Sequence, residues 1–214
     1  MSTMELVPIK TVYGEDKSWD EICELDSEDV CKRTCSTFNK SEGGYTVKCF
    51  GIDFKVYPCD RKIECHDTGG ELFLGKLKDF FRLSVLWYFA SAKDIPYSER
   101  LVKPTDVKGG QRFSTGTHVL PLDAIANKYG RNPEGFLRHA RKFGAETVAG
   151  LGDVALRLYP LPRVPVTMLL WVEDEEFPPR VDLFFDSTCD FQISLSDIVW
   201  AVAMMCALVM LEDT

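Results

Sequence analysis

The chain has 214 residues, of which 45% are hydrophobic and 12% aromatic, enough to bury the core of one domain. Its 25 basic and 33 acidic side chains give a formal net charge of -8, which argues against a general binder of nucleic acids or anionic membranes. We therefore expect a globular domain with neither a nucleic-acid nor a membrane partner.

The first 25 residues hold scattered apolar anchors among acidic side chains and show no sustained period. We expect a lead-in arm over residues 1–25, either extended or loosely packed. The beginning of the sequence has no apolar core of a signal peptide and no small-residue cleavage site, so we expect a cytoplasmic protein. Reduced thiols are the matching expectation for its eight cysteines.

A capped helix and a hairpin are predicted next. Asp26 and the acids after it are typical of a helix start. Apolar and polar residues then alternate over 45–49 and 52–56, on either side of a turn at Gly51. This pattern predicts a β-hairpin, which we expect residues 62–65 to extend.

The central part of the chain has helical patterns. Apolar residues recur at helical spacing from Leu72 to Ala92, which predicts the longest amphipathic helix. Two shorter helices are predicted at about 121–129 and 133–143, the second with Asn132 as its cap and Gly144 as its stop.

Strand patterns follow at 154–159, 166–172 and 181–185, and they predict an antiparallel meander. The run from Ile198 to Leu211 is apolar almost all round, so we expect a helix packed against the sheet. A bilayer span needs about twenty apolar residues, and this run is shorter than that.

The order of these elements predicts the α+β class, because strands and helices do not alternate regularly. We expect a single α+β domain over residues 26–214 that begins with a helix and a β-hairpin. Central helices, the β-meander and a buried C-terminal helix complete it. Its cysteine-bearing part covers 26–70 and the remainder covers 71–214.

Six of the eight cysteines lie in the first third of the chain, and a histidine adjoins the last of them. Thiolates hold zinc or an iron–sulfur cluster when three or four converge, and two of these cysteines are four residues apart on a predicted helix. The candidate metal ligands are Cys23, Cys31, Cys35, Cys59, Cys65 and His66. The alternative is ordinary buried thiols, because no C-x-x-C pair occurs.

The turn between the last two predicted strands holds four successive carboxylates, followed by Phe177-Pro178-Pro179. Like charges in one turn raise pKa values, which suits cation binding or acid–base chemistry beside a pocket. We expect a largely apolar pocket here for a ligand or partner, and the candidate binding residues are Arg112, Arg163, Asp174, Glu175, Glu176 and Phe177. The alternative is a solvated turn.

Charge is unevenly distributed along the chain. Residues 1–70 carry 9 basic and 14 acidic side chains (-5), residues 71–172 carry 15 and 9 (+6), and residues 173–214 carry 1 and 10 (-9). Attraction within one compact fold would account for this distribution. The alternative is a basic face reserved for an anionic ligand.

A series of stretches carries a family resemblance: Leu86-Trp-Tyr-Phe89, Gly109-Gly-Gln-Arg-Phe113, Gly130-Arg-Asn-Pro-Glu-Gly-Phe136, Gly152-Asp153, Leu161-Pro-Arg-Val-Pro165, Leu170 to Pro179 and Leu183-Phe-Phe-Asp186. With them the chain, from about residue 72 onward, resembles an uncharacterised prokaryotic family known as domain of unknown function 3786. Members occur in anaerobic bacteria and archaea, and some are described as iron–sulfur proteins. The resemblance implies an accessory or binding role in anaerobic metallocofactor metabolism and transfers no catalytic residue.

The G-x-S-x-G, H-E-x-x-H, P-loop and G-x-G-x-x-G signatures are absent. We therefore expect a non-catalytic binding or accessory protein for a small ligand, such as a corrinoid or another tetrapyrrole, or for a partner metalloenzyme. One alternative is a zinc or iron–sulfur protein that uses the N-terminal cysteines. A second is an enzyme that uses the hairpin carboxylates.

Overall fold

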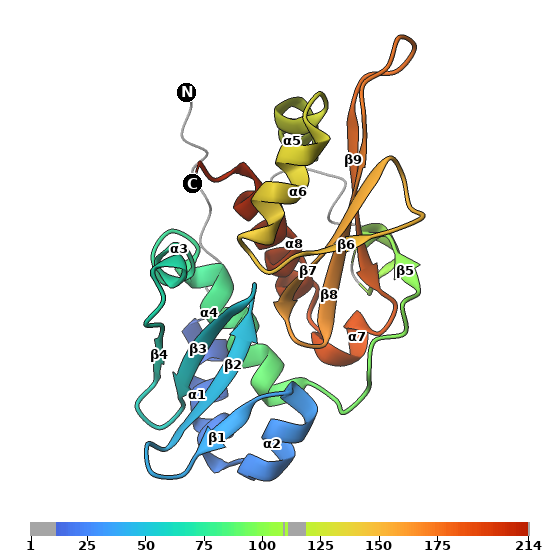
Figure 1. Cartoon of the computed structure of the whole chain (residues 1–214). Helices are drawn as coiled ribbons and strands as arrows, with labels where there is room; N and C mark the ends of the chain where they lie inside the picture. The colour runs from blue at the N-terminus through green and yellow to red at the C-terminus, as the bar shows by residue number, and fades with distance from the viewer. Residues whose placement is uncertain (1–11, 109, 111–118, 214) are drawn as a thin grey trace.

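A computed structural model describes residues 12–108, 110 and 119–213, and these form two antiparallel sheets with helices between and beside them (Figure 1). The helices are α1 (Val12–Glu24), α2 (Ser27–Thr34), α3 (Glu71–Leu74), α4 (Lys78–Ser91), α5 (Leu122–Tyr129), α6 (Pro133–Arg141), α7 (Cys189–Gln192) and α8 (Ser196–Leu211), with 3-10 turns η1 (Thr68–Gly70) and η2 (Pro104–Asp106). The predicted α+β class is confirmed.

The first sheet has the order β1 (Thr37–Asn39), β2 (Gly44–Cys49), β3 (Ile52–Tyr57) and β4 (Lys62–Glu64). The second has the order β5 (Leu101–Val102), β9 (Arg180–Asp186), β8 (Val164–Trp171), β7 (Val154–Leu161) and β6 (Glu146–Val148). The predicted hairpin and meander are thus confirmed, while the short strands β1, β5 and β6 were not predicted.

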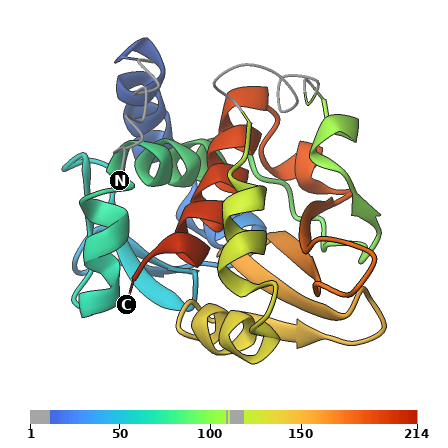
Figure 2. The same ribbon diagram turned by 90° about the horizontal axis from the view of Figure 1, so that it is seen from above.

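Helix α8 lies in the middle of the molecule, beside α4 and next to α5 and α6 (Figure 2). Its buried residues lie on every side of the helix, because other elements surround it. The prediction of a buried C-terminal helix is therefore confirmed. The predicted long helix over 72–92 is instead divided into α3 and α4, since the chain leaves helical geometry at Gly75.

The expectation of an arm over residues 1–25 is wrong for α1. Trp19 and Ile22 are 2% and 1% exposed, and α1 packs against α4. On the outer side of α1, Asp16 and Asp20 form ion pairs with Arg61 at 3.0 and 2.7 Å. The two buried side chains are three residues apart, so one short apolar stripe is enough to dock a helix whose other faces are polar.

Two glycine turns from distant parts of the chain touch each other. Gly51 joins β2 to β3 with a φ of 77°, and Gly144 follows α6 with a φ of 67°. A Cβ atom on Gly144 would lie 2.7 Å from the Cα of Gly51, so neither turn has room for a side chain. Beside them, the amide of Phe50 donates a hydrogen bond of 2.7 Å to the carbonyl of Tyr159 and joins the two sheets.

We expect Gly144→Ala to lower the free energy of unfolding by about 2 kcal/mol or more, because it adds a steric clash to the strain of a left-handed residue. Gly150→Ala is the matched control. Gly150 has a similar φ of 79° but nothing within 4 Å of the added Cβ. Urea unfolding measures both variants, and equal losses would show that the contact between the turns contributes nothing.

Candidate functional site

The acidic hairpin turn between β8 and β9 projects from the body of the molecule (Figure 1). Within it, the Asp174 carboxylate accepts hydrogen bonds from the amides of Glu176 and Phe177 at 2.8 and 2.7 Å. Glu173 binds Arg131 through two contacts of 2.6 Å, and these hydrogen bonds lower the pKa of the Glu173 carboxyl. These two carboxylates therefore shape and anchor the turn.

The expected pocket bordered by this turn and Arg163 is wrong. Glu175 and Glu176 are exposed, and Phe177 is 66% exposed. Arg163 lies in the β7–β8 turn, at the opposite end of β8, and the eight residues of that strand separate the two turns by about 23 Å. Successive turns of a meander lie at opposite ends of its strands. Arg112 lies outside the described residues.

The proposed metal ligands do not come together. Cys23 of α1 and Cys59 of the β3–β4 turn form a disulfide, with their Cα atoms 5.3 Å apart. The expectation of reduced thiols is therefore wrong for this pair, which α1 brings to the turn by docking beside it. Among the described residues, no group of three or more cysteine, histidine or acidic side chains is arranged to hold a metal ion.

The remaining candidate ligands have separate surroundings. Cys35 ends α2 in a left-handed conformation with a φ of 54°, so it does not continue the helix on which Cys31 lies. The Cys65 thiol faces the carbonyl oxygens of Asp53 and Asp67 at 3.5 and 3.6 Å. The cysteines and His66 therefore do not fit an iron–sulfur cluster or a structural zinc ion.

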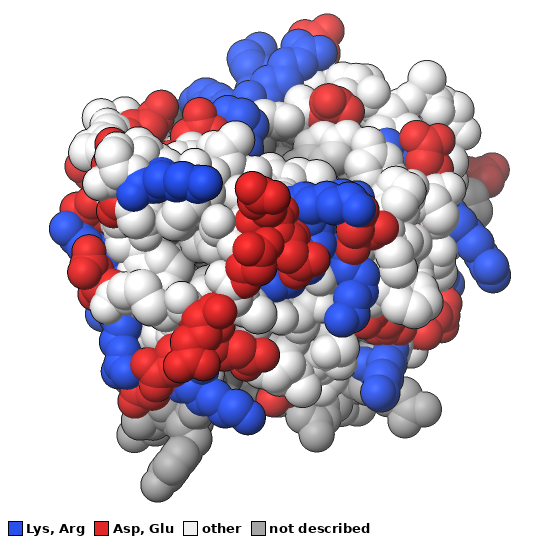
Figure 3. Space-filling model, turned by 90° about the horizontal axis from the view of Figure 1, so that it is seen from below, with Lys and Arg blue, Asp and Glu red and all other residues white. Residues whose placement is uncertain are grey.

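Ion pairs within the fold balance part of the uneven charge along the sequence. Acidic and basic side chains are interspersed over the face seen in Figure 3. Cations of the central segment pair with acids of both ends: Arg82 with Glu15, Arg131 with Glu173, Lys128 with Asp213 and Lys76 with Glu212. These four pairs agree with attraction within one compact fold.

Arg163 does help to build a site, although not at the hairpin turn. Its Nε donates to the carbonyl of Arg33 at 2.8 Å, and its Nη2 donates to the carbonyl of Lys32 at 2.9 Å. The same Nη2 contacts the carboxylate of Asp94 at 2.6 Å. Arg163 therefore joins the C-terminal end of α2 to the segment that follows α4.

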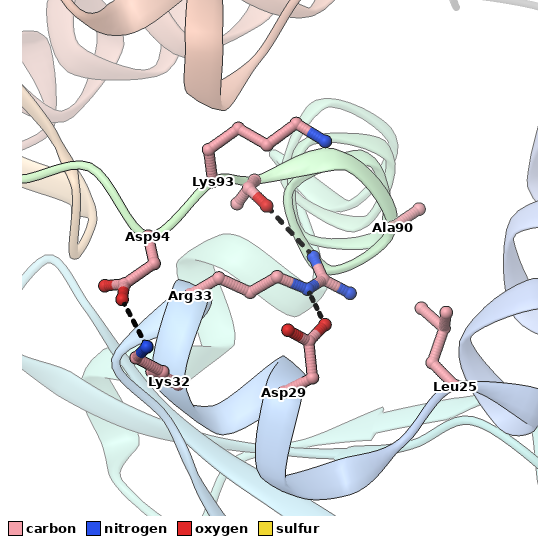
Figure 4. Close-up of a pocket in the computed structure, with 8 residues that line it drawn as sticks. Leu25, Asp29, Lys32, Arg33, Ala90, Lys93 and Asp94 are labelled. Carbon is pink, nitrogen blue, oxygen red and sulfur yellow. Dashed lines mark hydrogen bonds and ion pairs between the residues drawn. The ribbon is translucent and has the colours of Figure 1, made fainter.

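A pocket of about 360 Å³ opens beside these contacts, between α2 and the end of α4 (Figure 4). Both apolar and charged side chains line it. They are Leu25, Asp29, Lys32, Arg33, Ala90, Ala92, Lys93 and Asp94.

Arg33 occupies the centre of the pocket, and its side chain is only 10% exposed. Its Nε donates to Asp29 at 2.7 Å, and its Nη1 donates to the carbonyl of Ala92 at 3.2 Å. Its Nη2 makes no hydrogen bond with any described residue. Figure 4 shows this nitrogen directed toward the space between Ala90 and Leu25. A nearly buried guanidinium thus presents free N–H groups to the pocket.

The pocket has an excess of positive charge, since three cationic and two acidic side chains line it. Lys32 lies 3.0 Å from Asp94, and its hydrogen bond, together with Arg163, lowers the pKa of that carboxyl. The Lys93 ammonium has no ion pair with a described residue. Lys93 is therefore available to an anion, and Arg33, which is paired with Asp29, offers its Nη2 edge.

The sequence analysis predicted one residue beside this pocket. Arg163 was a candidate binding residue, but its partner segment could not be read from its neighbours. Arg33 and Lys93 were not predicted, because a basic residue near the end of a helix is ordinarily solvated. Arg33 is buried where α2 packs against the end of α4.

None of the described helices is both long enough and apolar enough to cross a bilayer. In comparisons with known proteins, the model of a family described as a domain of unknown function (DUF3786) matches residues 26–208. The match includes the cysteine-bearing helix and hairpin as well as the later elements. No curated protein and no solved structure matches the chain.

Proposed function

The chain belongs to the DUF3786 family, whose description names no activity, and we propose from the pocket itself that it is a binding protein for a small ligand carrying a carboxylate or phosphate group. The observation that carries this proposal is the nearly buried Arg33, whose Nη2 lacks a partner and points into the pocket. This edge of the guanidinium is accessible from the pocket, so it can donate hydrogen bonds to an anionic oxygen.

The walls indicate how such a ligand would lie. Asp29 and the Ala92 carbonyl hold the guanidinium in one orientation, which reduces the entropy lost when an anion binds. Lys93 offers a second, more mobile cation, while Leu25 and Ala90 offer apolar surface. The ligand is therefore amphipathic, with its anionic group on Arg33 and Lys93 and a small apolar body beside them.

The pocket volume limits the size of what it encloses. At about 360 Å³ it lies at the lower end of the range for small-molecule sites. A corrinoid or another tetrapyrrole is larger, so only a carboxylate-bearing edge of such a ring would enter. The sequence resemblance suggests a more specific proposal. In it, the protein has an accessory role in anaerobic metallocofactor metabolism and binds a tetrapyrrole or a partner metalloenzyme at this pocket.

Titration with succinate and, separately, with inorganic phosphate tests the proposal, with NMR following the backbone amides of Ala92 and Lys93. We expect Arg33→Lys to weaken binding by about tenfold, because it keeps the charge but loses the planar donor edge. Lys93→Ala should weaken binding by a smaller factor, since Lys93 is exposed.

Lys40→Ala is the matched control. Lys40 is an exposed lysine beyond β1 with no ion pair to a described residue, so its loss changes the net charge but not the pocket. Binding to this variant should equal binding to the parent protein. The proposal is wrong if neither anion shifts the two amides, or if Arg33→Lys binds both anions as tightly as the parent does.

A further inference from the structure

Among the described residues, strand β9 is paired along only part of one edge. On one side it pairs with β8 along six of its seven residues, from Arg180 to Phe185. On the other side, within the described part of the chain, β5 pairs with Phe185 and Asp186 alone. We propose that the remaining edge binds an extended peptide as an added antiparallel strand, at a site separate from the anion pocket.

Hydrogen bonding at the paired end shows which main-chain groups are free. The amide of Ser187 donates to the carbonyl of Arg100 at 2.8 Å, so Ser187 directs its main-chain groups toward β5. Because this direction alternates along an antiparallel strand, Val181 and Leu183 direct their N–H and C=O groups to the same side. No described residue forms a hydrogen bond with these groups there.

The two residues are fixed in place by their side chains. Val181 and Leu183 are 4% and 3% exposed, because their side chains lie in the core. Their N–H and C=O groups therefore have a set direction toward the groove, where they alternate in the pattern that a peptide backbone complements.

The chain itself stops pairing at this point for a clear reason. Pro104 has no N–H to donate, and the chain turns into η2, where the amide of Asp106 donates to the carbonyl of Lys103 at 2.9 Å. A groove of about 400 Å³ remains between β9, η2 and the start of α5. It is lined by Lys103, Pro104, Thr105, Val119, Leu120, Leu122, Asp123, Arg180, Val181, Asp182, Leu183 and Phe184.

The groove favours a free extended segment over the strand of a folded partner. Residues of η2 and the start of α5 line the groove together with β9, so an added strand has to fit beside these elements. A single peptide strand needs less room there than the edge of a second folded sheet. Apolar side chains of the peptide opposite Val181 and Leu183 would lie on the same side of the sheet as those residues, toward Leu120 and Leu122.

Charge indicates the direction and the ends of the peptide. A strand antiparallel to β9 would begin near Lys103 and end near the acidic hairpin turn, where Glu175 and Glu176 are exposed. The one cation that lines the groove at this end, Arg180, is paired with Asp182 at 3.1 Å. An acidic residue at the beginning and a basic residue at the end complement these charges. The peptide therefore begins with an acidic residue, has β-branched apolar residues at two alternate positions, and ends with a basic residue.

The probe is an acetylated and amidated hexapeptide pool of the pattern Glu-Val-X-Val-X-Lys, in which X excludes cysteine and proline. In NMR titrations we expect the amides of Val181 and Leu183 to shift and their hydrogen exchange to slow by about tenfold or more. The matched pool has N-methylvaline at both valines. It keeps every side chain but cannot donate to β9, and it should bind at least about tenfold more weakly.

A pair of exposed positions provides the protein control. Val119, on the groove, is 53% exposed, and Leu195, outside it, is 43% exposed. Val119→Glu should weaken binding of the pool, whereas Leu195→Glu should not. The proposal is overturned if a millimolar concentration of the pool shifts neither amide or if the methylated pool binds equally well. It is also overturned if the same amides respond to protein concentration alone, which would identify a second copy as the occupant.

Discussion

Replacing Asp186 by alanine is expected to lower the free energy of unfolding by about 3 kcal/mol. The carboxylate is 2% exposed and lies at the end of β9. It accepts hydrogen bonds from the amide and hydroxyl of Ser98 at 3.0 and 3.1 Å, and from the amide and hydroxyl of Thr188 at 2.9 and 2.7 Å. Alanine leaves these donors without their shared acceptor and releases the segment that leads into β5.

The loss should depend on pH. Burial by itself raises the pKa of Asp186, but the hydrogen bonds from Ser98 and Thr188 outweigh it, and the pKa lies below its ordinary value of 3.8. The folded state therefore holds the ionised form more strongly than the unfolded state does. The contribution to stability is present above pH 3.8 and is lost as the pH falls through the lower, folded-state pKa.

Urea unfolding at neutral pH and at successively lower pH checks this result. Asp182→Ala is the control, because Asp182 lies on the same strand but has a side chain that is 34% exposed. It should lose less than about 1 kcal/mol and should show a weaker pH dependence. Equal losses for the two variants, or a loss at Asp186 that does not change with pH, would contradict the account.

Reduction of the disulfide between Cys23 and Cys59 is expected to lower the free energy of unfolding by about 4 kcal/mol, the value for closing a loop of this size in the unfolded chain. The two cysteines are separated by 36 positions in the sequence. Arg61 also ties α1 to the same turn through Asp16 and Asp20. Those ion pairs are solvent-exposed and contribute little, so they will not replace the covalent link.

Urea unfolding with and without dithiothreitol measures this effect. The double variant Cys23→Ser, Cys59→Ser should be as unstable as the reduced protein and should no longer respond to the reductant. Cys35→Ser removes an exposed free thiol and is the matched control. It should keep the full response. A double variant that remains as stable as the oxidised protein would show that the link does not restrict the unfolded chain.

Periodicity predicted the helices and strands in which buried side chains recur several times along one face. The alternation around Gly51 predicted β2 and β3, and the apolar run to Leu211 predicted α8. Strands β1, β5 and β6 have two or three residues each, too few for a period to appear. Helix α1 was missed because its described core contacts come from only Trp19 and Ile22.

Single residues of the candidate site also show what the sequence could predict and what it could not. Arg163 was predicted as a binding residue beside the acidic turn, yet it lies at the opposite end of β8 and holds the end of α2. Arg33 appeared as one charge among many on a short helix. It is held by the carbonyl of Ala92, the residue that follows α4, 59 residues away in the sequence. Local sequence cannot encode which distant segment will cover a side chain.

The sequence alone determined the α+β class, the capped helix at Asp26, the hairpin, the meander and the buried last helix. Each depends on side-chain spacing or on backbone preferences within a few residues. Only the tertiary structure decided the contact between Gly51 and Gly144, the pairing of Cys23 with Cys59, the pocket around Arg33 and the open edge of β9. These features join segments that are remote in sequence, so they exist only when the packed elements bring them together.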